Sequence, residues 1–568
     1  MNLAGTGASD LARALRQLGV RRVFGLCSDQ TNNIFCALAL EDIDIIGTRH
    51  ESGAIHMAEG WARASGEPGV AVIGGGPGFV NGVTGIAVAQ AAAVPLVVIA
   101  GQPAIQTRER NGHQILYQAD IVRSLTKWSQ ELASPDTVAE FVARGFQIAT
   151  AGKPGPVCLS LPTNVSEGAL SPAAAPYRVY PLQRDMHAVP AAHAGPVAAA
   201  AGMLNRSARP VMIIGATAWR GIGSGRLTAL IRQLGIPAFT FEVARGMIPD
   251  DGVIGFGYAH PQYNRTFHEL KNADLVVLVG AEIGLHTGDP KKKMLDPDVH
   301  IIQIHNDPEQ TGIGRSADAA IIGSLAGGLE ALAAGMDPAA RERQSAWLGN
   351  VRSKYAEQQA NWKSLHEKLC VGNSSIHPLR VHRSLSRHYS DRIRLSIDGG
   401  DFANWARVYF QARTPGYWLD KTEMGNIGVS LPVGIGAQLG RPAEQTWVLI
   451  GDGGFGFHGL ELSTAVEFKL PIKVIVGNDR CWGVERRLQL AHYGRTVATD
   501  LPDIRYDRIA QVLGAKGLHV DDPAKLDAAV DELLLSDGPG VLNVTMQRDA
   551  GRLTDDRTVQ TNKPPGDQ

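Results

Sequence analysis

Two glycine-rich stretches each follow an apolar run: Ile450-Gly-Asp-Gly-Gly-Phe-Gly-Phe-His458 and Val476-Gly-Asn-Asp-Arg-Cys-Trp482. Asp479 comes 27 positions after Asp452, which leaves room for a helix, expected from about residue 459 to 468, and a returning strand. Because such a crossover is right-handed and makes its two strands parallel, we expect both aspartates at the same carboxyl edge of a sheet.

Paired carboxylates at a strand edge suit Mg²⁺, which takes oxygen ligands and commonly holds a phosphate against the protein. Glycines around Asp452 let backbone N–H groups approach that phosphate, and a helix N-terminus adds a favourable dipole. The alternative is a plain strand-to-helix turn in which Asp452 caps the helix. The two stretches therefore predict either a diphosphate clamp or a capped turn.

The composition describes a globular protein of several domains. The chain has 568 residues, of which 44% are hydrophobic and 20% charged, and a net charge of -1. This balance excludes a broad basic surface for nucleic acid or an anionic membrane. The five cysteines lack metal spacing, and neither a signal segment nor a membrane span is recognisable. We therefore expect a cytoplasmic protein with no nucleic-acid or membrane partner.

Short apolar runs alternate with helix-forming sequence in three blocks, which predicts an α/β protein with three doubly wound parallel-sheet domains. Examples of the runs are residues 69–73, 95–100, 210–214, 274–279 and 447–450. We expect domains at 1–169, 196–337 and 374–548, linkers at 170–195 and 338–373, and a polar tail or lid at 549–568. The middle block is expected to be Rossmann-like.

Other motifs favour the diphosphate clamp. The stretch Arg49-His-Glu-Ser-Gly-Ala-Ile-His resembles the segment that carries the activating glutamate of thiamine diphosphate enzymes. Gly76-Pro-Gly resembles the next turn of these enzymes, and Gly425-Asn-Ile-Gly-Val-Ser-Leu-Pro resembles their pyrimidine-supporting segment. From residue 2 to about 548, the chain resembles the acetolactate synthase-like family, which includes benzaldehyde lyase and 2-hydroxyacyl-CoA lyases. The resemblance implies an N-terminal pyrimidine-binding domain and a C-terminal diphosphate-binding domain.

The resemblance also implies roles around the cofactor. Glu51 would hydrogen-bond a pyrimidine nitrogen and so promote formation of the thiazolium ylide; alternatively it is a helix-start carboxylate. The Gly425 carbonyl would accept a bond from the cofactor, and Ile427 would wedge its two rings into a bent V. Other expected cofactor contacts are Gly76, Gly400, Asp401, Phe402, Gly451, Asp452, Gly453, Gly454, Asp479, Cys481 and Trp482. At Gly400 and Asp401 we expect backbone contacts to the diphosphate, or a plain glycine turn.

The implied metal ligands are side-chain oxygens of Asp452 and Asp479 and the backbone carbonyl of Cys481. Asp479 departs from the commonest pattern of the family, which has Asn at this position. Either Mg²⁺ binds more tightly here, or Asp479 is partly protonated or displaced. Asn478 is expected to be a turn or outer residue, and a fallback ligand.

Substrate-side residues are expected in two loops. The first holds Cys27, Ser28 and Gln30, and the second holds His113, Gln114, Tyr117 and Gln118. Gln30, His113, Tyr117 and Gln118 are the candidates for catalysis. Tyr117 is either an oxyanion donor or a core-edge aromatic, and His113 is either a proton shuttle or a solvated loop residue.

The implied function is a thiamine diphosphate- and Mg²⁺-dependent enzyme that makes or breaks a carbon–carbon bond beside a carbonyl, through a ylide and an enamine. We rank acetolactate synthase-like or benzaldehyde lyase-like carboligase or lyase chemistry first. Next come 2-hydroxyacyl-CoA cleavage and 2-keto acid decarboxylation; a noncatalytic relative that retains the fold is the alternative of another class. Substrates would be 2-keto acids, aldehydes, 2-hydroxy ketones or 2-hydroxyacyl-CoAs, and the assembly a homodimer or homotetramer. An FAD or coenzyme A-nucleotide site in the middle domain is conceivable but not expected, since the glycine spacing after Gly215 does not match the full dinucleotide motif.

Overall fold

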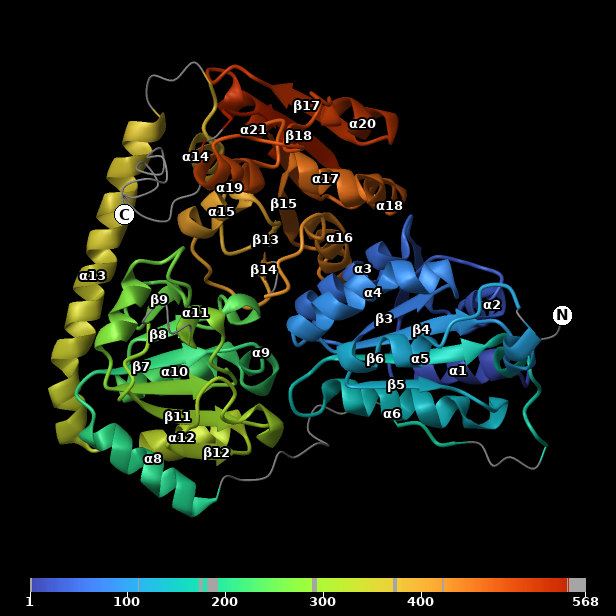
Figure 1. The fold of residues 1–568 in the computed structure, drawn as a ribbon, viewed down its shortest axis with the longest axis horizontal. Helices are drawn as coiled ribbons and strands as arrows, with labels where there is room; N and C mark the ends of the chain where they lie inside the picture. The colour runs from blue at the N-terminus through green and yellow to red at the C-terminus, as the bar shows by residue number, and fades with distance from the viewer. Residues whose placement is uncertain are drawn as a thin grey trace.

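Three sheets organise the chain in the computed structural model, which describes residues 3–110, 112–172, 177–180, 193–288, 294–370, 375–420, 423–548 and 550. Each sheet has six strands within these residues, and all the strand pairs are parallel. Helices cover both faces of the sheets (Figure 1). The expected class, three doubly wound parallel-sheet α/β domains, is confirmed.

The N-terminal sheet has the strand order β2-β1-β3-β4-β6-β5. Its strands are β1 Arg22–Gly25, β2 Asp44–Gly47, β3 Gly69–Ile73, β4 Leu96–Gln102, β5 Trp128–Glu131 and β6 Pro156–Pro162. Its helices are α1 Gly7–Gln17, α2 Asn32–Leu40, α3 Glu51–Ser65, α4 Pro77–Ala91, α5 Gln118–Ile121, α6 Val138–Thr150 and α7 Thr163–Ser166.

The central sheet has the order β12-β11-β10-β7-β8-β9, which is the strand order of Rossmann domains. Its strands are β7 Pro210–Ile214, β8 Ala238–Thr240, β9 Gly255–Tyr258, β10 Leu275–Val279, β11 His300–His305 and β12 Ala319–Ile322. Its helices are α8 Ala194–Arg206, α9 Ala218–Gly221, α10 Ser224–Leu234, α11 Leu285–Gly288 and α12 Leu325–Ala334.

The C-terminal sheet, β14-β13-β15-β16-β18-β17, repeats the order of the N-terminal one. Its strands are β13 Ile393–Ile397, β14 Trp418–Asp420, β15 Gln445–Gly451, β16 Lys473–Asn478, β17 Lys516–Val520 and β18 Gly540–Thr545. Its helices are α14 Pro378–Ser386, α15 Asp401–Tyr409, α16 Ser430–Gly440, α17 Asp452–His458, α18 Leu462–Glu467, α19 Gly483–Tyr493, α20 Tyr506–Val512 and α21 Leu526–Leu534. The helix expected from about residue 459 to 468 is present as a 3-10 turn, Gly459–Glu461, followed by α18, and the short helix α17 precedes it.

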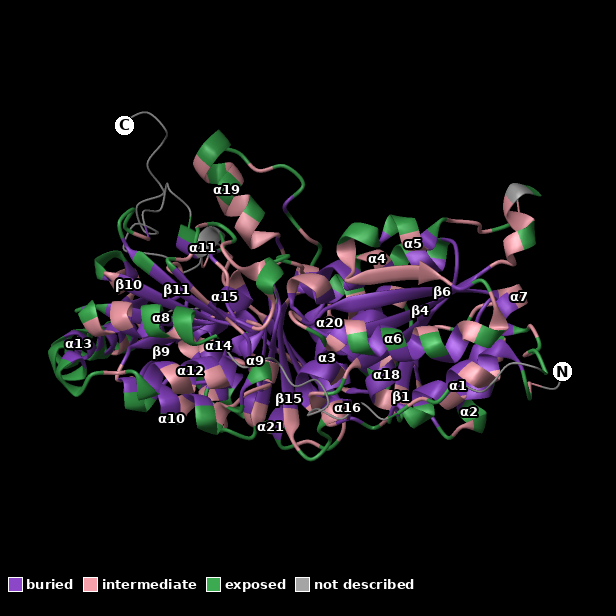
Figure 2. Cartoon of the chain, turned by 90° about the horizontal axis from the view of Figure 1, so that it is seen from below, coloured by how far each residue is buried: buried purple, intermediate pink, exposed green. Residues whose placement is uncertain are grey.

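The central strands are apolar on both faces because helices cover both sides of each sheet. Every residue of β3, β4, β7 and β10 is buried. Figure 2 shows these buried strands inside a more exposed helical layer, from which α19 stands out. No residue of α19 is fully buried.

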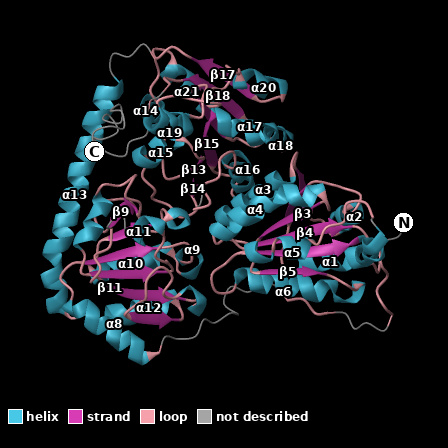
Figure 3. Ribbon diagram, viewed as in Figure 1, coloured by secondary structure: helices cyan, strands magenta, loops and turns pink. Residues whose placement is uncertain are grey.

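A long helix, α13 Pro338–Cys370, occupies most of the expected second linker. Trp347, Val351 and Tyr355 of this helix pack in a core cluster of the central domain. The helix also contacts α14 of the C-terminal domain, and it runs along the edge of both domains (Figure 3). The segment is therefore a rigid connection that adds to the central core.

Much of the expected first linker and, except for Ala550, the expected tail lie outside the described residues. In the part of the chain that is described, no helix is long and apolar enough to cross a membrane.

Helices α3 and α16 join the N- and C-terminal domains at backbone distance. A Cβ atom added to Gly60 would lie 1.9 Å from the Val433 carbonyl oxygen, and one added to Gly436 would lie 1.8 Å from that of Met57. Residues of both domains, including those of α3 and α16, form one continuous hydrophobic cluster. Glycine is thus required on both helices, because any side chain would force them apart.

We expect Gly436→Ala to destabilise the protein by about 2 kcal/mol, because overpacking at a backbone contact cannot be relieved by a rotamer change. Thermal unfolding followed by circular dichroism checks this. Gly349→Ala is the control, since an added Cβ at Gly349 on α13 meets no atom within 4 Å. If both variants melt at the same temperature, the close contact of α3 with α16 is wrong.

Candidate functional site at the carboxyl edges of two sheets

The predicted C-terminal residues gather where the C-terminal sheet reverses its strand order, between β13 and β15. Such switch points are the usual ligand crevices of open parallel sheets. Asp398, just past β13, is fully buried and accepts hydrogen bonds from the backbone N–H groups of Gly399, Gly428 and Ser430 and from the Ser430 hydroxyl, at 2.7–3.0 Å. Asp398 therefore holds the loop after β13 against the pyrimidine-supporting segment, a role that the sequence did not reveal.

Asp452 and Asp479 follow the adjacent parallel strands β15 and β16, which pair through Gly451 and Gly477. Asp452 is buried, and its Oδ1 accepts from the Gly453 N–H at 2.9 Å. Its Oδ2 is also buried, and no described residue gives it a hydrogen bond. Asp479 Oδ1 accepts from the Cys481 N–H at 3.3 Å. The expected parallel arrangement of the two strands is confirmed.

The pKa values of both carboxyl groups are raised, so their ionised forms are disfavoured. Burial, and then the charge of Asp479, raises the pKa of Asp452 to about 7. Burial likewise raises the pKa of Asp479 to about 6, with Asp401 adding to the effect and hydrogen bonds from Cys481 opposing it. A divalent cation would offset both effects. The donor set, with a partnerless carboxylate oxygen, fits a hard cation.

Protein side chains alone do not complete a metal site. Among the described residues, no three His, Cys, Asp or Glu side chains form a metal-binding group. Further oxygen ligands would come from a backbone carbonyl such as that of Cys481, from a diphosphate or from water. The Asn478 amide nitrogen donates instead to Ile504 O (3.1 Å) and Asn543 Oδ1 (3.2 Å).

The loop after β16 is tightly held. Arg480 has a left-handed φ of 58°. Arg548 donates to the carbonyl oxygens of Asp479 (3.2 Å) and Arg480 (2.7 Å). Cys481 is buried, and burial raises the pKa of its thiol. The ring of Trp482 covers Gly453, where an added Cβ would lie 2.3 Å from a ring carbon.

Asp401, the first residue of α15, forms an ion pair with Arg487 of α19, with nitrogen–oxygen distances of 2.5 and 3.2 Å. The preceding residue, Gly400, has a left-handed φ of 90°. The pair partly neutralises a carboxylate that would repel phosphate, while the backbone N–H groups at the start of α15 remain directed along the helix axis. Arg487 had no assigned role in the sequence.

The segment Gly425–Gly428 bends through two left-handed glycines, with φ values of 71° and 78°. A Cβ added to Gly428 would lie 2.4 Å from Phe457 Cβ, and one added to Gly399 would lie 2.5 Å from Ile427 Cγ2. Ile427 therefore lies against the loop after β13, and Gly428 lies beside the backbone of Gly454.

A second group of predicted residues lies at the switch point between β1 and β3 of the N-terminal sheet. Gln30 donates to Gln114 Oε1 at 2.7 Å and accepts from the Gly75 N–H at 3.4 Å. Gly76 has a left-handed φ of 56°, and an added Cβ there would lie 2.6 Å from Gln114 Cβ. Gln118 is fully buried; it donates to Gly101 O (3.0 Å) and accepts from Ser160 (2.8 Å).

The remaining substrate-side candidates are on the surface. His113 is exposed, and Tyr117 is 58% exposed. The guanidinium of Arg108 lies 5.2 Å from the centre of the Tyr117 ring and also pairs with Glu131. Of the two roles expected for Tyr117, the exposure argues against an aromatic at the edge of the core.

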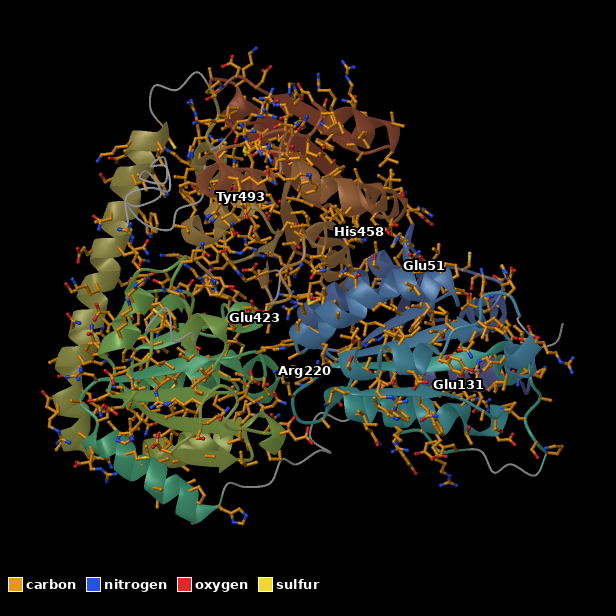
Figure 4. All side chains as sticks on the ribbon, in the orientation of Figure 1. Glu51, Glu131, Arg220, Glu423, His458 and Tyr493 are labelled. Carbon is orange, nitrogen blue, oxygen red and sulfur yellow. The ribbon has the colours of Figure 1, made fainter. Side chains whose placement is uncertain are left out.

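Glu51 begins α3 and accepts from Asn81 Nδ2 at 3.1 Å. The other domain holds the turn just before α3, because the Glu461 carboxylate accepts from the backbone N–H groups of Arg49 and His50 at 3.0 Å. His50 itself is the N-cap of α3, and its side chain accepts from the Ser52 N–H. Burial raises the pKa of Glu461 to about 7. Figure 4 shows Glu51 and His458 where these two domains meet. The contact of Glu461 with Arg49 joins residues more than 400 positions apart, so no local pattern in the sequence could indicate it.

The carboxyl edge of the central sheet contacts the N-terminal domain. Lys153 of the N-terminal domain donates to Glu282 (2.9 Å) and Gln310 (3.2 Å), which follow β10 and β11. On α10 of the central domain, Arg226 pairs with Glu330 of α12.

We expect Asp398→Asn to loosen both loops, because one acceptor oxygen becomes an amide donor that faces other donors. Hydrogen exchange measured by mass spectrometry should be at least about tenfold faster in residues 426–430, which corresponds to roughly 1.4 kcal/mol. Asp274→Asn is the matched control, since Asp274 also accepts from Ser207, Ala208 and Arg209 but lies in the central domain. Unchanged exchange in 426–430 would contradict the role of Asp398.

Comparison with known proteins accounts for all three domains. The family "Thiamine pyrophosphate enzyme, N-terminal TPP binding domain" matches residues 5–121. The family "Thiamine pyrophosphate enzyme, central domain" matches residues 197–332. The family "Thiamine pyrophosphate enzyme, C-terminal TPP binding domain" matches residues 398–544.

Similar proteins span nearly the whole chain. The chain is 29% identical to the probable acetolactate synthase of Mycobacterium bovis, over 94% of each chain. It is 29% identical to the acetolactate synthase of Bacillus subtilis, over 95% of this chain and 92% of the relative. It is also 29% identical to 2-hydroxyacyl-CoA lyase 2 of Bos taurus, over 90% of this chain and 84% of the relative.

With its three domains matched in order and relatives that span nearly its whole length, the chain belongs to the thiamine pyrophosphate enzymes and is an acetolactate synthase-like carboligase or lyase.

Proposed function

We propose that the protein uses thiamine diphosphate and Mg²⁺ to make or break a carbon–carbon bond beside a carbonyl, as an acetolactate synthase-like or benzaldehyde lyase-like enzyme. The observation that carries this proposal is the buried, partnerless Oδ2 of Asp452 next to Asp479 at the switch point of the C-terminal sheet. Thiamine diphosphate supplies an electron sink for cleavage of a bond next to a carbonyl carbon. The residues of the chain bind it, orient it and control protons.

Asp452, Asp479 and the Cys481 carbonyl would hold Mg²⁺, and the metal would hold the diphosphate. Backbone groups of Gly400, Asp401, Phe402, Gly451, Gly453 and Gly454 would surround the diphosphate. The Asp401–Arg487 ion pair supports this assignment, because it removes most of the repulsion between Asp401 and an anion. Trp482 would close the clamp over Gly453.

Glu51 would hold a proton at a pyrimidine nitrogen, with Gly425 and Ile427 setting the ring orientation. Gln30, His113, Tyr117 and Gln118 would face the substrate side, with Gly76 forming the turn beside them. The buried amide of Gln118 is fixed by Gly101 and Ser160, which suits a positioning role better than proton transfer.

We also propose that a homodimer or homotetramer completes the site, with Glu51 serving the cofactor held by a second copy. Exposed apolar side chains next to the clamp, Phe457 (58% exposed) and Leu460 (63%), support such an interface. The substrate would be a 2-keto acid, an aldehyde or a 2-hydroxy ketone. The relatives named 2-hydroxyacyl-CoA lyase 2 favour 2-hydroxyacyl-CoA cleavage as the second candidate; decarboxylation of 2-keto acids ranks below it.

The test of the function is a panel of pyruvate, benzoin-type ketols and 2-hydroxyacyl-CoAs, with products identified by mass spectrometry. We expect turnover of at least one class, and Glu51→Gln to lower kcat by at least about 100-fold through loss of the proton at the pyrimidine. Cofactor affinity, measured by circular dichroism titration, should change little. Cofactor binding without any product from the panel would contradict the proposal.

Metal dependence provides a second test. Mg²⁺ must displace protons from Asp452 and Asp479, whose pKa values are about 7 and 6, so its affinity should rise between pH 6 and pH 8. Asp452→Ala should weaken Mg²⁺ binding at least about tenfold, while Asp479→Asn keeps an oxygen ligand and should flatten the pH dependence. Calorimetric titration at several pH values checks both. Mg²⁺ affinity that is equal in Asp452→Ala and the unaltered protein would rule out the assigned ligand.

A further inference from the structure

A series of hydrogen bonds connects α3, the helix that begins at Glu51, to the Gly425–Gly428 segment. The hydroxyl of Ser52, the second residue of α3, lies 2.7 Å from Nε2 of His458, the last residue of α17. Nδ1 of the same ring lies 2.7 Å from the carbonyl oxygen of Gly428. Figure 4 places Glu51 and His458 at this junction. One imidazole thus spans two segments that are distant in the sequence.

The proton positions in this series of hydrogen bonds follow from its acceptors. The Gly428 carbonyl can only accept, so the proton of His458 is on Nδ1. Burial and the nearby His56 lower the pKa of His458 to about 4, which leaves the ring neutral at neutral pH. Nε2 is then an acceptor, and the Ser52 hydroxyl donates to it.

His50 adds a peripheral contact. Its Nδ1 lies 2.7 Å from the Ser52 hydroxyl oxygen and 3.2 Å from the Ser52 backbone nitrogen. It donates to the hydroxyl when Nδ1 is protonated and accepts from the backbone N–H when it is not. Because His50 is exposed, whereas Ser52 is buried, the fixed part of the series is Ser52–His458–Gly428.

Both ends of this series are rigid. At one end, Glu461 accepts from the backbone N–H groups of Arg49 and His50 just before α3, and a Cβ added to Gly53 would lie 2.2 Å from Glu461 Oε1. At the other end, the Gly428 N–H donates to the buried Asp398 at 2.8 Å. A hydrogen bond between two fixed segments sets their separation.

We propose that Ser52 and His458 are a positioning pair that fixes the start of the Glu51 helix relative to the Gly425–Gly428 segment. This inference rests on the proposed function, in which Glu51 and Gly425 act on cofactor pyrimidines. Neither residue touches the reacting atoms; the pair acts through the backbone on each side of it. Glu51 would serve the cofactor held by a second copy of the protein, whereas Gly425 would serve the cofactor held by its own copy. The pair therefore links residues of one polypeptide that belong to two different active sites.

The test uses the matched variants Ser52→Thr and Ser52→Val, which have the same shape and differ in the hydroxyl. With thiamine diphosphate and Mg²⁺ bound, we expect exchange of the C2 proton of the cofactor to be about tenfold slower in Ser52→Val than in Ser52→Thr, because a misplaced acid loses its near-attack geometry. Ser463→Ala is the control at the same interface, since Ser463 accepts from Arg49 at 2.9 Å. It should match the unaltered enzyme.

A second measurement needs no cofactor. Nitrogen NMR of ¹⁵N-histidine-labelled protein should show His458 with its proton on Nδ1 in all three proteins, because the Gly428 carbonyl can only accept. The Nε2 signal should shift in Ser52→Val, where Nε2 loses its hydroxyl donor, and stay close to that of the unaltered protein in Ser52→Thr. Equal exchange rates and equal His458 signals in the two variants would overturn the inference. If the unaltered enzyme binds the cofactor but shows no C2 exchange, the proposed function fails, while the NMR comparison still decides whether the Ser52–His458 hydrogen bond exists.

Discussion

The packing of α3 against α16 is the contact on which the remaining structure depends. The two helices approach so closely at Gly60 and Gly436 that the backbone of each contacts the other. Because the N-terminus of α3 carries Glu51 and α16 follows directly after Gly428, this contact sets the spacing of the two switch points. Polar contacts from Glu461 and His458 then fix the angle and register of the helices. The apolar cluster shared by the two domains supplies the stabilisation, and the polar contacts supply the specificity.

The three carboxylates at the carboxyl edge of the C-terminal sheet differ in how their charges are balanced. Burial disfavours the anions of Asp452 and Asp479, although hydrogen bonds from Gly453 and Cys481 partly oppose this effect. By contrast Asp401, close to Asp479, already has a cationic partner in Arg487. The charges are thus divided between one carboxylate that pairs with Arg487 and two whose anionic forms are disfavoured by burial. Such unbalanced carboxylates are typical of functional sites.

The sequence alone predicted the sheet class, the strands and the meeting of Asp452 with Asp479, because these depend on local periodicity and on the handedness of crossovers. It did not predict contacts between side chains that are far apart in the chain. The contacts of Glu461 with Arg49, of Arg487 with Asp401 and of His458 with Ser52 each depend on tertiary packing, because the partners are far apart in the sequence. The extent of the short helix α17 was not predicted, because its glycine-rich sequence has low helix propensity. The burial of Gln118 was also hidden, because the pairing of β4 with β6 brings Ser160 beside it.

The contact of Lys153 with the central sheet has a mechanical consequence. In Rossmann domains the crevice at the carboxyl edge usually receives a nucleotide. Here the backbone of Gly215 approaches Gly280 so closely that an added Cβ would lie 2.3 Å from the carbonyl oxygen, and Lys153 docks on Glu282 and Gln310 nearby. The central domain therefore connects the two outer domains. It contacts the N-terminal domain through Lys153 and the C-terminal domain through α13. Loss of the Lys153 charge would remove this contact with Glu282 and Gln310. It would thereby change how firmly the N- and C-terminal domains are held together.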